Sequence, residues 1–287
     1  MNTSKKGRLF ARIPGRYFPW TTFAFVCLLS CLLAILFRSI QLGGSINFAT
    51  GFYNGSSALM FALNFSLVLF AVLLFLMSWM SRTEYLIQMG RHSHKALKYL
   101  SFVLCAAFLI NGFVDLYQMM ISRTQVMGVL EIFGAAASIG AGLSFLFQGL
   151  TIQQPRESAV SALYGVPCIW SCIVLITMFV QHTVVVTVSE NLYNILRMIF
   201  LVIFLLTSSK FLAGYADKKN ERWLLFTGLM TIVLSAVTTI PLLIVRLFGK
   251  FYTVSHVVQA GPLDFLLMLY TAVFVFAYLK GRRRTQL

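Results

Sequence analysis

Three polar residues share one helical face inside a long apolar segment and could bind a polar solute or an ion. Asn111, Asp115 and Gln118 follow the spacing i, i+4 and i+7 within the apolar segment 99–121. This spacing places side chains on one face of an α-helix, and a segment of that length can cross a bilayer. An ionisable side chain inside a bilayer costs about 2.5–3.5 kcal/mol, so it usually faces protein or water and has a partner. The pattern predicts a membrane helix with a polar stripe.

A second polar stripe supplies the expected partner. Glu190, Asn194 and Arg197 repeat the same spacing at the start of a later apolar segment. The helix dipole disfavours Asp115, in the C-terminal half of its helix, and equally disfavours Arg197, in the second turn of its own helix. At a rise of about 1.5 Å per residue, both lie roughly 9–10 Å from the outer surface, as does His182 on another segment. We therefore expect Asp115 and Arg197 to form an ion pair in the bundle interior.

This layer has two interpretations, which the sequence leaves open. The ion pair is either a structural link between two helices or part of an outward-facing pocket. In a pocket, Asp115 would bind a cation or relay a proton, Arg197 would hold an anionic group or neutralise Asp115, and His182 could titrate near neutral pH. The candidate ligand-binding residues are Asn111, Asp115, Gln118, His182, Asn194 and Arg197.

The remaining acidic residues have simpler explanations. Glu190 and Asp264 are expected in the first turns of helices that begin at the outer side, where free N–H groups and the helix dipole favour a carboxylate. Gly261 and Pro262 mark an ordinary helix start before Asp264. The same capping role stays open for Glu131, which lies deeper in its apolar segment. The other four acids fall in predicted cytoplasmic segments and need no functional explanation: Glu84, Glu157, Asp217 and Glu221.

The composition identifies the environment of these helices. Of the 287 residues, 59% are hydrophobic and only 11% are charged, whereas soluble domains carry about 25% charged residues. Spanning helices need about 17–25 apolar residues. We predict an all-α polytopic membrane protein, a single integral membrane domain 1–287 with about eight transmembrane helices, at approximately 19–37, 57–80, 98–121, 127–150, 161–187, 192–213, 223–245 and 263–279.

The basic residues predict the orientation of the bundle. With the N-terminus inside, 18 of the 23 Lys and Arg residues fall in cytoplasmic segments, whereas outer segments hold only Arg38, Arg123, Arg246 and Lys250. This positive-inside pattern and the even number of spans place both termini in the cytoplasm. The first apolar segment has no small-x-small cleavage site and is expected to remain as a span. Because the net charge of +15 gathers at segment edges, we expect the cytoplasmic loops to contact anionic lipid headgroups, and we expect no nucleic-acid binding.

Three small residues predict a site of close helix packing. Gly134, Ser138 and Gly142 recur at every fourth position of one apolar segment. Such a face lets two helices approach closely. Packing within the bundle is the favoured interpretation, and the alternative is that this backbone lines a substrate path.

The other motifs give no support for a cofactor or for catalysis. The five cysteines lie inside apolar segments, which argues against disulfides, and helix packing explains their two i, i+4 pairs better than a metal does. His92 and His94, in a basic loop, are a weak ligand set, and the spans lack the paired histidines that hold haem. No protease, phosphate-loop or serine-hydrolase signature is present. We expect no metal or cofactor, and catalysis only if an unfamiliar intramembrane family is involved.

Two functions therefore remain. The favoured one is a small-solute transporter or permease component, with the bacterial cytoplasmic membrane (the cell inner membrane) as the simplest location. The alternative is a membrane-embedded sensor, receptor or accessory subunit that acts through a protein partner. A continuous polar track across the midplane favours transport. A polar pocket closed below the outer third by an apolar plug favours the alternative.

Overall fold

Eight α-helices dominate the computed structural model of this chain. The structure describes residues 19–44, 57–81, 91–121, 129–151, 158–182, 189–215, 217–247 and 261–284. In chain order the helices are α1 (Trp20–Gly44), α2 (Ser57–Met80), α3 (Arg91–Ile121), α4 (Val129–Thr151), the 3₁₀ helix η1 (Ser158–Gly165), α5 (Val166–His182), α6 (Ser189–Leu212), α7 (Lys218–Leu247) and α8 (Pro262–Arg284). All eight α-helices are long and apolar enough to cross a membrane. The chain is therefore an all-α, multi-pass integral membrane protein, as the sequence predicts.

The helix bounds differ from the predicted spans at several ends. The first helix continues beyond residue 37 and includes Arg38 within its last two turns. The third begins at Arg91, seven residues before the predicted span. The fifth ends at His182, and residues 183–187, which the predicted span included, lie outside the described part. A polar residue at the edge of an apolar segment does not end a helix, because its backbone hydrogen bonds continue.

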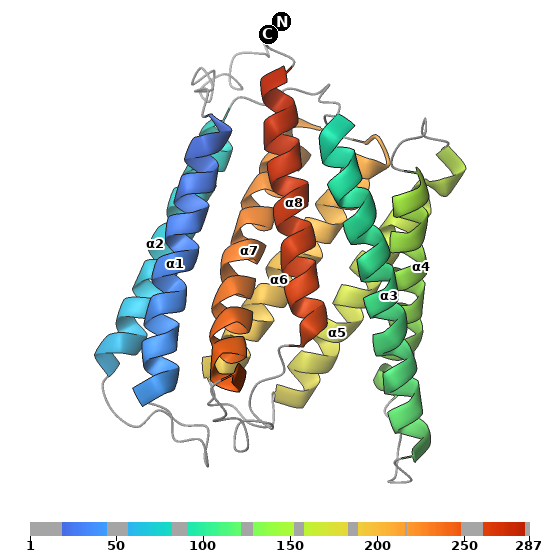
Figure 1. Cartoon of the computed structure of the whole chain (residues 1–287), viewed down its shortest axis with the longest axis horizontal. Helices are drawn as coiled ribbons and strands as arrows, with labels where there is room; N and C mark the ends of the chain where they lie inside the picture. Colours follow the sequence, from blue (N-terminus) through green and yellow to red (C-terminus); the bar gives the residue numbers. More distant parts are fainter. Residues whose placement is uncertain are drawn as a thin grey trace, which may run out of the picture.

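The seventh helix is the centre of the bundle. It packs against α1, α2, α6 and α8. In its apolar stretch 78% of the residues are buried, a larger share than in any of the other seven spans. The pair α3 and α4 joins the bundle through α8 and α5, and α5 in turn packs on α6. Helix α1 begins and α8 ends at the same end of the bundle (Figure 1), which we call the inner end because the sequence predicts it to be cytoplasmic. The opposite end is the outer end.

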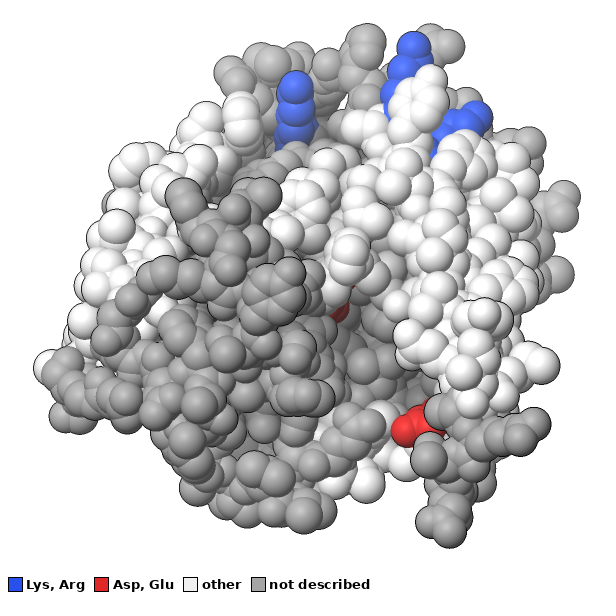
Figure 2. Space-filling model, turned by 60° about the horizontal axis from the view of Figure 1, so that its bottom comes forward, with Lys and Arg blue, Asp and Glu red and all other residues white. Residues whose placement is uncertain are grey.

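The lateral surfaces of the bundle are apolar, and the exposed basic side chains of the described residues gather at one end. Large apolar side chains such as Phe61, Phe65 and Ile110 are more than half exposed, as expected for residues that face lipid. When the outer end is turned forward, the visible Lys and Arg side chains lie along the upper margin of the view, away from that end (Figure 2). The distribution of apolar and basic surface agrees with a bundle embedded in a bilayer.

A continuous stack of buried aromatic rings fills the core from the middle of the bundle to the inner end. It starts where Trp170 meets Phe108 edge-to-face, with ring centroids 4.7 Å apart, and it ends where Phe211 meets Tyr278 at 5.3 Å. Rings at these distances attract one another beyond the burial of their area. We call this set the aromatic column, and its members are Phe108, Phe145, Trp170, Phe204, Phe211, Tyr270, Phe274 and Tyr278.

The eighth helix begins deeper than its neighbours. Its lower end stops short of the lower ends of α3 and α5 (Figure 1). Its first turn therefore lies inside the outer half of the bundle and points its free N–H groups there. This recessed helix start determines which side chains meet in the site described next.

Candidate functional site

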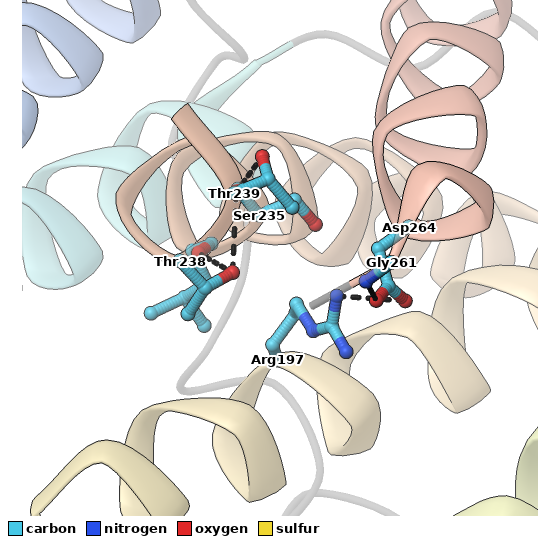
Figure 3. A network of polar contacts seen from close by, with 7 residues as sticks. Arg197, Ser235, Thr238, Thr239, Gly261 and Asp264 are labelled. Carbon is cyan, nitrogen blue, oxygen red and sulfur yellow. Dashed lines mark hydrogen bonds and ion pairs between the residues drawn. The ribbon is translucent and has the colours of Figure 1, made fainter. Parts of the chain in front are cut away.

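A buried ion pair joins α6 to the start of α8. The Nη1 of Arg197 lies 2.8 Å from the Oδ1 of Asp264, and the two side chains are 3% and 14% exposed (Figure 3). Arg197 is eight residues into α6, whereas Asp264 is in the first turn of α8. They can meet only because the first turn of α8 lies at the same depth below the outer end of the bundle as Arg197. The pair neutralises two charges that a bilayer interior would otherwise exclude.

The carboxylate of Asp264 has a second role, the predicted helix cap. Its Oδ2 accepts a hydrogen bond of 2.9 Å from the backbone N–H of Gly261, three residues earlier. This is the reciprocal contact of a capping box, in which the side chain at N3 reaches back to the N-cap residue. The sequence prediction named the cap but not the arginine.

The predicted ion pair between Asp115 and Arg197 is wrong. The Oδ2 of Asp115 instead accepts a hydrogen bond of 2.9 Å from the Nδ2 of Asn111 on its own helix. Helix α3 packs on α4 and α8, whereas α6 packs on α5 and α7, so the two residues belong to different contacts. Two residues at the same depth in the membrane are not neighbours unless their helices pack together. Asp264 reaches Arg197 first because α8 lies between α3 and the centre of the bundle.

The stripe on α3 continues the face that packs inward. Phe108 belongs to the aromatic column, and a Cβ on Gly112 would lie 2.8 Å from the Cγ1 of Ile139 on α4. Asp115 follows one to two turns further out on the same side, because residues i and i+7 share a helical face. It is only half-buried, as is Asn111, and Gln118 is exposed. This stripe lies where α3 extends outward beyond the start of α8.

The other two predicted site residues lie at the end of α5 and inside α6. His182 ends α5, and its side chain is outside the described part of the chain. Asn194 lies on α6 one turn outward from Arg197 and is 4% exposed. The structure thus places Asn194 and Arg197 in one buried region and Asn111 with Asp115 on a separate helix.

Two polar atoms of this region are buried without a hydrogen-bond partner among the described residues. They are the Oδ1 of Asn194 and the Nε of Arg197. Leaving a buried donor or acceptor unpaired costs about 1–3 kcal/mol, and more for a charged group. Most such groups in native structures are paired, so an exception calls for a physical explanation.

A second polar cluster in the outer half was missed by the sequence analysis. Arg38 donates from Nη1 to the Oε1 of Gln41 at 2.7 Å, and its guanidinium lies over the ring of Tyr193 at 5.3 Å. The hydroxyl of Tyr193 donates to the Oδ1 of Asn64 on α2 at 2.5 Å. Arg38 and Gln41 are 4% and 1% exposed, so Arg38 is interior to the bundle and not in an outer loop. Their i, i+3 spacing beside an apolar segment was the signal available in the sequence.

Hydroxyl groups on α7 lie near the ion pair. Ser235, Thr238 and Thr239 occupy the outer half of α7 (Figure 3). Thr239 donates to the carbonyl of Ser235 at 2.6 Å, and Thr238 donates to the carbonyl of Leu234 at 3.1 Å. The hydroxyl hydrogens of Thr238 and Thr239 are used within the helix, so these two groups contribute acceptor lone pairs to the region.

The inner end holds a buried acid that the sequence analysis set aside. Glu221, in the first turn of α7, is 1% exposed, and its Oε1 accepts a hydrogen bond of 2.6 Å from the hydroxyl of Tyr278. The next residue, Arg222, lies with its guanidinium 5.0 Å from the ring centre of Trp79 on α2. The sequence analysis assigned Glu221 to a cytoplasmic segment with no functional role, and it did not predict that the side chain is buried. Tyr278 of the aromatic column covers it.

The small residues of α4 meet different helices. Ser138 donates to the backbone carbonyl of Phe108 on α3 at 3.0 Å, and a Cβ on Gly142 would lie 3.2 Å from the carbonyl oxygen of Cys105 on the same helix. A Cβ on Gly134 would approach only Ile173 of α5, at 3.9 Å. We propose that Ser138 and Gly142 hold α3 and α4 together.

The described part of the chain contains no metal-ligand cluster. Within it, no three His, Cys, Asp or Glu side chains gather around a common point, and the five cysteines are free thiols. No protein-family model, no curated protein and no solved structure matches the chain significantly.

Proposed function

We propose that this membrane protein binds a small polar solute from the outer side and passes the binding signal to a protein partner, as a sensor, receptor or accessory subunit does. The binding region is the outer half of the bundle around Asn194, Arg197 and Asp264. The stripe of Asn111, Asp115 and Gln118 on α3, with His182 at the end of α5, would line the approach from outside.

The observation that supports this proposal is the aromatic column. Its rings are in contact from Trp170 in the middle of the bundle to Tyr278 at the inner end, and all its members are buried. Its polar groups are the indole N–H of Trp170 and the hydroxyls of Tyr270 and Tyr278, and the two hydroxyls already bond to Gln148 and Glu221. A buried aromatic column of this kind offers no series of free polar groups that could bind a charged or polar solute along a path through the inner half. Polar recognition in the outer half combined with a closed inner half favours signalling over passage.

Transport by a permease component is the second candidate, and the hydroxyl groups of α7 favour it. Thr227, Thr231, Ser235 and Thr239 recur at every fourth residue, are all buried and cross the middle of the bundle. Their oxygen lone pairs could guide a solute if the surrounding helices separated. In this conformation Thr227, Thr231 and Thr239 bond to their own helix.

The two candidates differ in where a bound solute goes. The purified protein in lipid nanodiscs is screened by thermal unfolding against small amino acids, carboxylates, phosphate, sugars and amines. Solutes that stabilise it are then offered, radiolabelled, to proteoliposomes. We expect stabilisation by at least one solute class and no accumulation above protein-free liposomes. Accumulation inside the liposomes would favour transport, and the absence of any stabilising solute would contradict both candidates.

The cellular setting is part of the same proposal. The bacterial cytoplasmic membrane suits a chain whose basic residues cluster at the inner end, because anionic headgroups attract such clusters. The exposed lysines of the inner end would contact headgroups or an acidic partner surface, and among the described residues they are Lys95, Lys210, Lys218, Lys219 and Lys280.

A further inference from the structure

We infer that the ligand recognised around Arg197 is a zwitterionic α-amino carboxylate, such as a free amino acid. This inference rests on the proposed solute-binding function and names the chemical class of its ligand. It is argued from the two unpaired atoms of α6, from the shape of the arginine contact and from the charge balance of the region.

The contact with Asp264 uses only part of the arginine. A single oxygen of the carboxylate meets Nη1, because the other oxygen is engaged by the N–H of Gly261. The Nε of Arg197 has no partner among the described residues. The edge formed by Nε and Nη2 is one of the edges with which a guanidinium grips a carboxylate through two parallel hydrogen bonds. Arg197 is therefore already neutralised on one side and retains a carboxylate-binding edge on the other.

Asn194 supplies the complementary group. It lies one helical turn outward from Arg197, at 4% exposure, and its Oδ1 is the second unpaired atom. A carbonyl oxygen can only accept, so it requires a donor on the ligand. Residues i and i+3 of a helix lie about 5–6 Å apart at their Cβ atoms. This separation suits a ligand whose donor is on the carbon next to the carboxylate.

Charge balance selects the ammonium as that donor. Arg197 and Asp264 together carry no net charge, so a simple carboxylate would add an uncompensated negative charge to a buried region. An isolated buried charge is strongly disfavoured, whereas a zwitterion adds none. The α-hydroxy acids have the same geometry but bring a net charge, and they should bind more weakly.

Binding through Arg197 and Asn194 requires a movement of the helices around them. Both unpaired atoms are fully enclosed in this conformation. A ligand reaches them only when the outer ends of α6 and α8 separate, and the closed state then forms around it. A ligand that binds one of two states preferentially shifts the equilibrium between them.

The test is a ligand series with one carbon skeleton. Alanine, lactate, propionate and ethylamine are titrated against the full-length protein in nanodiscs, and larger α-amino acids are compared with the carboxylates that lack their amino group. Affinity should fall from alanine to lactate to propionate, with the amino acid at least about tenfold tighter than the matching carboxylate, and ethylamine should not bind. Equal affinity of amino acid and carboxylate would overturn the inference.

Two variants separate the two contacts. In Asn194→Leu the preference for the amino acid over its matching carboxylate should fall severalfold, because the ammonium loses its acceptor, while carboxylate binding persists. Arg197→Lys should weaken the binding of every carboxylate by about tenfold or more, because a lysine ammonium cannot form the two parallel hydrogen bonds of a guanidinium. The matched control, Arg222→Lys at the inner end, should change neither value. If Arg197→Lys does not fold, the wild-type series and Asn194→Leu still decide.

The outcomes distinguish this inference from the proposed function. If the wider screen finds stabilising solutes but none is an α-amino carboxylate, the ligand class is wrong and outward solute binding stands. If no solute of any class stabilises the protein, the proposed function fails and this inference fails with it.

Discussion

Arg197 and Asp264 meet at 2.8 Å where α6 passes the recessed start of α8, and the same carboxylate caps α8 through the N–H of Gly261. One aspartate thus orders a helix start and neutralises a buried arginine. The two helices flank the central α7, so the pair fixes the outer half of the bundle around that helix. The predictions below test this relationship and the helix packing that produces it.

Removing the charge of Asp264 should destabilise the protein strongly. Asp264→Asn keeps an oxygen that can accept from Gly261 but leaves Arg197 buried without a counter-charge. Breaking one side of a buried ion pair costs about 3–5 kcal/mol. Unfolding of the purified protein in mixed micelles should show this loss. The matched control, Asp217→Asn, changes an exposed aspartate and should stay within about 0.5 kcal/mol.

Double-mutant cycles should separate the observed ion pair from the one that the sequence predicted. Arg197→Met combined with Asp264→Leu should show a coupling free energy within the range of about 0.5–3 kcal/mol found for residues in contact. The same arginine variant combined with Asp115→Leu should be additive within about 0.5 kcal/mol. Strong coupling between Asp115 and Arg197 would mean that the native bundle brings α3 and α6 together.

Gly228 should tolerate no side chain. A Cβ at this position would lie 2.5 Å from the Cγ2 of Val275 and 3.1 Å from the ring of Phe204, both fully buried. Gly228→Ala should therefore cost about 1–3 kcal/mol through overpacking. Gly134→Ala is the matched control, since its nearest neighbour is 3.9 Å away and alanine favours the helix by up to about 1 kcal/mol. Equal stability of the two variants would contradict the tight contact between α7 and α8.

Cysteine labelling should confirm the orientation. Met120 is 80% exposed near the outer end of α3, and Asp217 is exposed at the inner end, just before α7. In intact cells a membrane-impermeant maleimide should label Met120→Cys and leave Asp217→Cys unlabelled until the membrane is opened. The native cysteines are the internal control, because all five lie within helices and are buried or half-buried. The reverse pattern would invert the predicted topology.

The stripe on α3 shows how far sequence patterns lead. The spacing of Asn111 and Asp115 predicts that they share a helical face, and their hydrogen bond at 2.9 Å agrees with it. That bond lies within a single helix, so the 3.6-residue period is sufficient to predict it. The same reasoning fails for Arg38, because the end of an apolar segment does not reveal that its helix continues and that the bundle buries the next residues.

The sequence by itself determined the class and the number of spans, because hydrophobicity over about 20 residues is a local property of a chain. The placement of Lys and Arg, also a local property, predicts the direction of the bundle. The sequence also determined which residues share a helix face. Only the tertiary structure decided which helices are neighbours and how deep each begins. Arg197 pairs with Asp264 and not with Asp115 because α8 starts inside the bundle, and that offset depends on the packing of all the helices together.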